Sequence, residues 1–348
     1  MKFPNLFAAV AACGLVAVVA ATSQADAAQE PVQESGQELG QELGQELAVV
    51  ARVGPWPIAS KLIGYRGRLW FVNSVLGRNH NSADVYSYDP VSRSTRYERH
   101  LFSQDSGDPI TKFGLLYWPS EDSRWSVGRG DSLVTNGEHW AMGTVPTAQI
   151  FHIHAMTSLG ARLIAATSAW RGGIQVSDDR GATWREIYDH PTPTRQVSRI
   201  VTLASTTERS YGYLLHRDTR RHISISGDVV AEVPGWPQDR PILGMAGLGE
   251  WLYALVRESA GIAIWRTDGV VSHAIAAPRA NWDAQDLVAS NGRLWLLTES
   301  AQGGAVWTSD DGGGWQQVVW LRGGSPYDLE IVDGVPFVGG TDGTQALI

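Results

Sequence analysis

Two histidines one residue apart give this sequence its clearest chemical signal. His152 and His154 lie in the apolar segment IFHIHAM, which predicts a strand, so both side chains point to the same side. His80 stands in the polar loop VLGRNHNSAD, and Glu121 stands in the polar loop SEDSRWSVGRG. If the fold brings these four side chains together, they are the candidate catalytic residues.

Two kinds of chemistry fit this set. The neutral imidazoles of His80, His152 and His154, with a carboxylate such as Glu121, could bind a divalent metal that acts as a Lewis acid. Alternatively, a histidine and a carboxylate could do metal-free general acid–base work on a glycan, of the hydrolase or lyase type. A plainer interpretation also exists, because a His-x-His pair on a strand is often structural.

Further polar and aromatic residues of the same region could bind the ligand. Arg78, Arg124 and Arg171 would suit an anionic group such as a uronate or a sulfate. Trp170 could stack on a sugar ring, or could form only a surface stack with Arg171. Asn81 is another candidate contact, although Asn-His-Asn in a loop is also common turn chemistry.

The elements that must position these residues come from a repeat. A glycine-bearing turn followed by an apolar strand recurs seven times, with most spacings in the forties. The sequence shows no convincing amphipathic helix. These features predict an all-β fold, a seven-bladed β-propeller with four-stranded blades, and a six-bladed one is the alternative. The seven segments are RGRLWFVNS, GLLYWPS, GARLIAATS, YGYLLHRD, GEWLYALVRES, NGRLWLLTES and DGVPFVGGTDG.

The last repeat is too short for four strands, because the chain ends at Ile348. The apolar segment LAVVARV, residues 47–53, precedes the first repeat and favours a strand. We expect it to supply the outer strand of the last blade, which would close the ring and cover two open sheet edges.

The octapeptide SDDRGATW, residues 177–184, has the form Ser-x-Asp-x-Gly-x-Thr-Trp, which suits a tight hairpin turn. Asp179 can accept hydrogen bonds from turn amides, Gly181 allows a positive φ, and Trp184 can pack back on the hairpin. Residues 309–315 are a relative with the tryptophan one residue early and no threonine. The octapeptide at residues 177–184 resembles the Asp-box (BNR repeat) of sialidase-like β-propellers. The resemblance implies a structural role in the turns for Ser177, Asp179, Gly181, Thr183, Trp184, Ser309, Asp311, Gly313 and Trp315.

The resemblance implies where a ligand would bind. The Asp-box lies between the third and fourth strands of a blade, and sialidase-like proteins bind their ligands on the opposite face. The candidate residues fall in loops and crossings on that opposite face, within three consecutive blades. Sialidase activity itself is not expected, since the chain has no Arg-Ile-Pro segment. Neither an arginine triad nor a Tyr–Glu nucleophile pair can be placed by motif.

The N-terminus predicts export. Lys2, the apolar run 6–21 and the small residues before Ala28 describe a signal peptide over 1–28, cleaved near Ala27 or Ala28. The alternative is a lipoprotein, because Cys13 ends a segment similar to a bacterial lipobox and its lipidation would attach the protein to a membrane. Residues 29–47, with three GQEL units, are expected to be a disordered linker, and residues 48–348 the propeller domain.

Charge and composition narrow the function. The formal net charge is −8 with no basic cluster, which argues against nucleic acid. Cys13 is the only cysteine, so the predicted mature chain has no disulfides. We therefore expect a secreted or periplasmic monomer that binds or processes a glycan or another anionic ligand. The alternative is a non-catalytic propeller that serves as an interaction scaffold for a cell-envelope protein.

Overall fold

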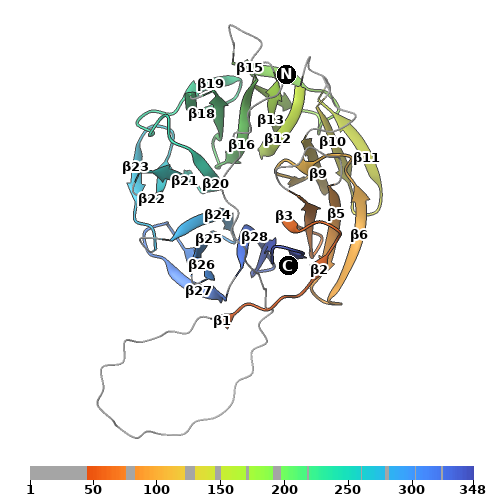
Figure 1. Cartoon of the computed structure of the whole chain (residues 1–348). Helices are drawn as coiled ribbons and strands as arrows, with labels where there is room; N and C mark the ends of the chain where they lie inside the picture. Colours follow the sequence, from red (N-terminus) through yellow and green to blue (C-terminus); the bar gives the residue numbers. More distant parts are fainter. Residues whose placement is uncertain are drawn as a thin grey trace, which may run out of the picture.

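The computed structural model places β-strands as blades around a central axis (Figure 1). It describes residues 45–75, 83–121, 130–145, 150–169, 172–190, 197–217, 219–259, 261–278, 282–301, 303–322 and 324–348. Within these ranges there is no helix, so none that could span a membrane. The prediction of an all-β propeller is confirmed.

Each blade is an antiparallel sheet whose strands follow one another from the axis outward. The strands of the first three blades are β3 (Ile58–Tyr65), β4 (Arg68–Ser74), β5 (Asp84–Asp89) and β6 (Ser94–His100); β7 (Asp105–Ser106), β8 (Ile110–Lys112), β9 (Leu115–Glu121), β10 (Asp131–Thr135) and β11 (Trp140–Thr144); and β12 (Ile150–Leu159), β13 (Arg162–Ala169), β14 (Gly173–Ser177) and β15 (Arg185–Asp189). In the second blade the inner strand is split into β7 and β8, which both pair with β9.

The other blades repeat this order. Their strands are β16 (Ser198–Ser205), β17 (Ser210–His216), β18 (Thr219–Ser226) and β19 (Val229–Glu232); β20 (Ile242–Leu248), β21 (Trp251–Glu258), β22 (Gly261–Thr267) and β23 (Ser272–Ile275); β24 (Asp283–Ser290), β25 (Arg293–Ser300), β26 (Gly303–Ser309) and β27 (Gln316–Leu321); and β28 (Ser325–Val332), β29 (Val335–Thr341) and β30 (Ala346–Leu347). This grouping is consistent with the seven blades that the repeats predict.

Both ends of the chain close the ring. Strand β2 (Arg52–Val53) pairs antiparallel with β30 as the outer strand of the last blade, as predicted. Ala51 and Ile348 also exchange backbone hydrogen bonds of 3.0 Å in both directions. Strand β1 (Gln45–Glu46) adds a parallel edge to β27 of the sixth blade, and Leu47 is buried. Residues 45–47, expected at the end of the linker, are thus paired with or packed on the propeller.

The core lies between adjacent blades. The second strand of each blade lies between two strands of its own sheet and has a neighbouring blade against each face. Its side chains are therefore buried on both faces, as in the Leu69–Ser74 part of β4. The fourth strand packs on one side only, and in β6 residues 94–97 are exposed. Large aromatic side chains fill the space between blades, for example Trp70 and Trp118 between the first two. Burial of this apolar surface holds the blades together.

The inner strands are irregular at one level. Strands β3, β12, β16, β20, β24 and β28 each carry a register shift in their pairing with the second strand. The second blade breaks its inner strand at the corresponding place, residues 107–109. A β-bulge leaves one residue unpaired and re-aims the neighbouring side chains. These irregularities surround the axis and position the side chains described next.

Candidate functional site

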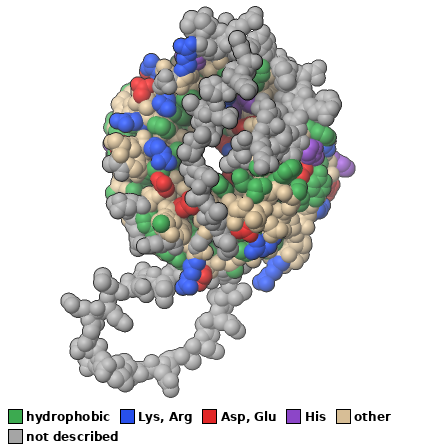
Figure 2. Space-filling view, viewed as in Figure 1, with side chains coloured by type: hydrophobic (Ala, Val, Ile, Leu, Met, Phe, Trp, Pro, Cys, Tyr) green, Lys and Arg blue, Asp and Glu red, His purple; other side chains and the backbone are tan. Residues whose placement is uncertain are grey.

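The strand directions define two faces of the propeller. The turn at residues 178–184, between β14 and β15, lies at the end where inner strands finish; we call this side the turn face. Inner strands begin, and second strands end, on the other side, which we call the crossing face. Glu121 at the end of β9 and His152 near the start of β12 therefore share the crossing face, close to the axis. The space-filling view shows the molecule hollowed at its centre (Figure 2).

His154 and Glu121 form a direct pair across the first two strands of neighbouring blades. The Nδ1 atom of His154 lies 2.8 Å from Oε1 of Glu121, and His154 is buried. The rings of His152 and His154 stack with their centroids 5.1 Å apart and an angle of 29° between planes. The structure therefore brings together three of the four predicted catalytic residues.

A close backbone approach fixes this geometry. The backbone N–H of Asp108 donates to the carbonyl of His154 at 2.8 Å, and the N–H of Met156 donates to the carbonyl of Asp108 at 3.1 Å. A Cβ atom on Gly107 would lie 2.3 Å from the carbonyl oxygen of Ile153, so only glycine fits there. This contact holds the inner strand of the second blade against that of the third.

The electrostatics define the protonation of the pair. Burial opposes ionisation of Glu121, but His154, Lys61 and His152 outweigh it and lower its pKa to about 2. The carboxylate is thus ionised and accepts, so Nδ1 of His154 carries the proton. Burial and the neighbouring His154 lower the pKa of His152 to about 3, which keeps that ring neutral. Among the described residues, the Nε2 atom of His154 is buried with no hydrogen-bond partner.

One residue nearer the turn face than His154, the inner strands of the seven blades share a ring of equivalent positions. Each position lies four residues before the last residue of its inner strand. We call this set of positions the axial ring. It is charged in four consecutive blades and uncharged in the other three. Its members, from the sixth blade around to the fifth, are Asp286, Asp328, Lys61, Asp108, Ala155, Val201 and Gly244.

Lys61 joins the charged members of the axial ring. Its Nζ lies 2.5 Å from Oδ1 of Asp108, and its backbone N–H donates to Oδ2 of Asp328 at 2.6 Å. Asp286 accepts in the same way from the backbone N–H of Leu329, at 2.9 Å. Lys61 has φ of 55°, a strained value for a residue with a Cβ, which the bond to Asp328 holds in place. The axial-ring carboxylates Asp286 and Asp328 thus each accept a backbone hydrogen bond from the next blade.

The carboxyl groups of the axis compete for protons. Burial and Glu121 raise the pKa of Asp105 to about 6, and burial raises that of Asp286 to about 6. Burial and Asp286 also raise the pKa of Asp328. Burial opposes the charge of Lys61, but Asp108 and the other carboxylates outweigh it and raise its pKa. The axis is therefore acidic and holds Lys61 as a permanent cation.

Sequence reasoning did not single out Lys61, Asp105, Asp108, Asp286 or Asp328. A signal for four of them exists, since they occupy one position of the repeat once the inner strands are aligned at their ends. The other predicted residues lie outside the described ranges: Arg78, His80, Asn81, Arg124, Trp170 and Arg171. Within those ranges, no group of three or more His, Cys, Asp or Glu side chains could hold a metal ion.

The turn face carries the hairpin at residues 177–184. The Asp179 carboxylate accepts from the backbone N–H and the hydroxyl of Thr183, at 2.8 and 2.6 Å, and from the Ser177 hydroxyl at 2.8 Å. Gly181 has φ of 90°, and its carbonyl accepts from the indole N–H of Trp184. In the related turn, the hydroxyl of Ser309 accepts from Gly312 and Asp311 accepts from Gly313. These contacts are internal to the turns.

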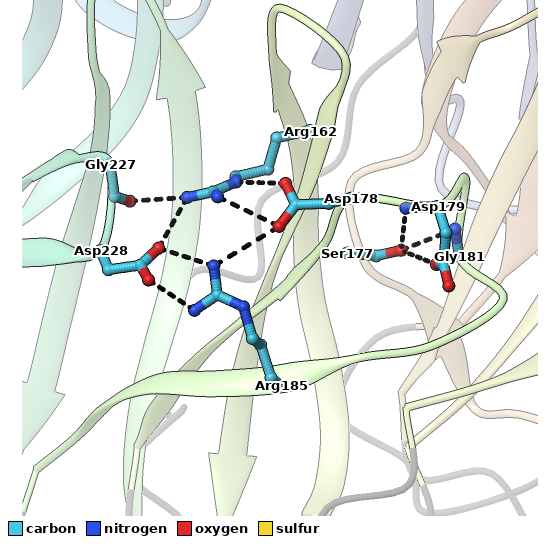
Figure 3. Close-up of polar contacts among 8 residues, drawn as sticks. All are labelled: Arg162, Ser177, Asp178, Asp179, Gly181, Arg185, Gly227 and Asp228. Carbon is cyan, nitrogen blue, oxygen red and sulfur yellow. Dashed lines mark hydrogen bonds and ion pairs between the residues drawn. The ribbon is translucent and has the colours of Figure 1, made fainter.

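Beside this hairpin an exposed ion-pair network joins the third and fourth blades (Figure 3). Arg162 contacts Asp178 at 2.7 Å and Asp228 at 2.8 Å, and Arg185 contacts Asp228 at 2.7 Å. The side chains of both aspartates are 54% exposed. The network is thus exposed to solvent, more than the His154–Glu121 pair but little more than Lys61–Asp108, whose side chains are 28% and 40% exposed.

No protein-family model matches the chain, and no curated protein matches it either. Solved structures do. YCF48 bound to a D1 peptide is similar with a TM-score of 0.55 and 14% identity, over 85% of this chain and 93% of that one. The β-propeller domain of the trilobed protease from Pyrococcus furiosus gives a TM-score of 0.53 and 9% identity, over 84% and 97%.

Enzymes are also among the similar structures. The GH74 enzyme of Niastella koreensis gives a TM-score of 0.54 and 14% identity, over 77% of this chain and 46% of that one. The chain likewise covers 52% of the acylaminoacyl peptidase of Pyrococcus horikoshii, so it spans about half the length of these two enzymes. At such identities the likeness concerns the fold alone. The protein is a β-propeller.

Proposed function

We propose that this propeller binds a glycan at the mouth of the central opening on the crossing face. The observation that carries the proposal is the His154–Glu121 pair, 2.8 Å apart, beside the neutral ring of His152. Buried, oriented polar groups at a concave site are what sugar hydroxyls require, because each lost water contact needs a replacement.

The charges of the site favour a neutral glycan over an anionic one. Asp105, Asp108 and Glu121, all of the second blade, border the mouth; Lys61 is already paired with Asp108, and Arg199 of the fourth blade acts on His152. An anion would meet an acidic surface there. Attraction of a uronate or a sulfate would depend on Arg78, Arg124 and Arg171, which lie outside the described residues.

The His154–Glu121 pair can also do chemistry. Glu121 accepts a hydrogen bond from Nδ1 of His154, and a ligand hydroxyl would reach Nε2 only after neighbouring side chains move, because that atom is buried. A glycan-processing reaction of the hydrolase or lyase type would use His154 as the base. Binding of a divalent metal by His152 and His154 is the alternative use of the same rings.

The test is calorimetric titration with a panel of neutral oligosaccharides, namely cellotetraose, xylotetraose, laminaritetraose and chitotetraose. We expect at least one to bind, and His154→Asn or Glu121→Gln to weaken it about tenfold, since a hydrogen bond to a charged group is worth about 1.5–3 kcal/mol. The control is His139→Asn, an exposed histidine on the turn face. If none of the four binds the wild-type protein, the proposal is wrong.

Two further measurements use the same samples. New reducing ends after incubation would show hydrolysis, and an unsaturated product absorbing in the ultraviolet would show a lyase. Metal analysis of the purified protein against a His152→Ala/His154→Ala variant tests the metal alternative. Metal in the wild-type protein that disappears in the variant would support it.

A peptide-binding scaffold is the second candidate. The similarity to YCF48 bound to a D1 peptide extends over 93% of that chain, so a propeller of this size can bind a peptide. In that case the oligosaccharides would not bind, and cross-linking in cells would capture a protein partner through the crossing face. Loss of the cross-link in Glu121→Gln would place the partner at the same mouth.

We also propose that the protein is an Asp-box propeller that works outside the cytoplasm. The contacts of Asp179 within its turn support the first point. The signal-like N-terminus supports the second. Mass spectrometry of the mature N-terminus tests it: a start near Gln29 fits cleavage, and a lipid on Cys13 fits a lipoprotein. An unprocessed Met1 in a cytoplasmic fraction would contradict both.

A further inference from the structure

Four residues share a second level of the axis, one residue nearer the crossing face than the axial ring. His154, Leu243, Gln285 and Tyr327 each lie five residues before the end of their inner strand. The pairing of each of these strands with the second strand leaves this residue out, and in β12 it leaves out Phe151 as well. The bulges thus release a side chain at the same height in the third, fifth, sixth and seventh blades.

Two of these bulge residues are large, apolar and exposed. Leu243 is 39% exposed and Tyr327 is 36% exposed, whereas the equivalent Ile200 of the fourth blade is fully buried. Solvent reaches an inner strand only from the central opening or its mouth. The two side chains therefore present apolar surface to the same space that His154 and Glu121 border from the other side of the ring.

A polar group lies between the two. Gln285, on the blade between those of Leu243 and Tyr327, donates from Nε2 to Oε2 of Glu299 at 2.9 Å. This bond orients the amide, whose oxygen can accept from a ligand hydroxyl. Burial and the Glu299 carboxylate raise the pKa of Tyr327, so its ring is a neutral phenol. Leu243, Gln285 and Tyr327 thus offer apolar surface and hydrogen-bonding groups, and none of the three is a cation.

We propose that Leu243, Gln285 and Tyr327 form a second wall of the ligand site, and that Tyr327 is the platform on which a neutral pyranose ring stacks. This inference rests on the proposed glycan-binding function. A pyranose has an apolar face of C–H groups and a rim of hydroxyls. Tyr327 matches the face, Gln285 on the adjacent blade matches the rim, and Leu243 adds apolar surface one blade further on. The His154–Glu121 pair, on the opposite side of the opening, would contact another unit of the oligosaccharide.

The experiment uses the full chain and whichever of the four tetrasaccharides binds the wild-type protein most tightly. Tyr327→Ala removes the platform and is expected to weaken binding about tenfold, the value of one aromatic contact. Tyr327→Phe keeps the ring and should stay within about threefold of wild type. Leu243→Ser should weaken binding about threefold. Tyr97→Ala is the matched control, because Tyr97 is an exposed tyrosine on the outer strand β6.

The outcomes separate the two proposals. No binding of any tetrasaccharide to the wild-type protein overturns the glycan function and this wall with it. Binding that Tyr327→Ala leaves unchanged, while Glu121→Gln weakens it, keeps the function and overturns the wall. Equal losses in Tyr327→Ala and Tyr97→Ala also overturn it, because the platform would then not be specific. The thermal unfolding midpoint of each variant, compared with that of the wild-type protein, tests whether the fold is retained.

Discussion

The two halves of the axial ring solve the same structural problem with different chemistry. In the sixth, seventh, first and second blades the ring positions hold Asp286, Asp328, Lys61 and Asp108, which bond from one blade to the next. In the third, fourth and fifth blades they hold Ala155, Val201 and Gly244, so at this level the apolar packing that joins all the blades has no charged side chain added to it. Charge is concentrated where the two ends of the chain meet.

This difference teaches where directional bonds are needed. The chain joins every blade to the next, but within the last blade the outer strand β2 comes from the other end of the sequence and is held to β30 only by strand pairing. A hydrogen bond from Lys61 to Asp328 specifies a register that apolar contacts alone leave open. The same charges then give the mouth above them its acidic character, so closure and ligand preference share residues.

The largest expected effect comes from breaking the charged half. Lys61→Met leaves the half-exposed Asp108 without its counter-ion and removes the cation that Asp105, Asp328 and Glu121 also face, so we expect the free energy of unfolding to fall by about 2 kcal/mol. Urea denaturation measures it. The control is Arg162→Met, which breaks ion pairs of similar length on the turn face. Equal losses in the two variants would show that the axial pair is no more important than an exposed one.

The reverse exchange sharpens the comparison. Val201→Asp places a carboxylate in the apolar half, where the fourth blade offers no partner equivalent to Lys61. We expect a loss of about 1.5 kcal/mol, the cost of a half-buried carboxylate with no counter-ion. Val201→Thr, with a similar shape and no charge, is the control. An unchanged midpoint for Val201→Asp would mean that the opening solvates charge in every blade alike.

The pH dependence of the charged half is the next effect. The pKa of Asp286 is about 6 in the folded protein and lies above its unfolded value, so ionisation destabilises the fold as pH rises. Asp286→Asn keeps an acceptor for Leu329 but cannot ionise. Relative to wild type, the variant should gain about 1 kcal/mol between pH 5 and pH 8. Parallel stability curves for the two proteins would contradict this assignment.

The smallest effect is expected on the turn face. Arg162→Met and Arg185→Met remove exposed ion pairs, which salt screens. Their losses should be smaller than that of Lys61→Met and should shrink further in 0.5 M salt. The effect of Lys61→Met should change less with salt, because the carboxylates of Asp108, Asp105, Asp328 and Glu121 act on Lys61 together at short range. A salt-insensitive loss at Arg162 would remove this distinction.

The sequence predicts the frame of this molecule better than its axis. Glycine turns at a regular spacing and a truncated last repeat suffice to predict the blades and the closing strand β2, because turn chemistry and edge protection are local rules. The pairing of His154 with Glu121 follows from their shared face. Lys61, Asp108 and Asp328 share a position of the repeat, but their roles could not be predicted from it, since those roles depend on bulges that form only when the blades meet.

The closing strand also determines how the ring responds to force. Strand β2 is antiparallel to β30, with Arg52 opposite Leu347 and Val53 opposite Ala346. The N-terminal end of β2 therefore lies beside the C-terminal end of β30. A pull on the two chain ends loads these few hydrogen bonds one after another, as a zipper opens, rather than all at once in shear. The propeller should therefore open mechanically at its seam, at low force, while the other blades remain intact.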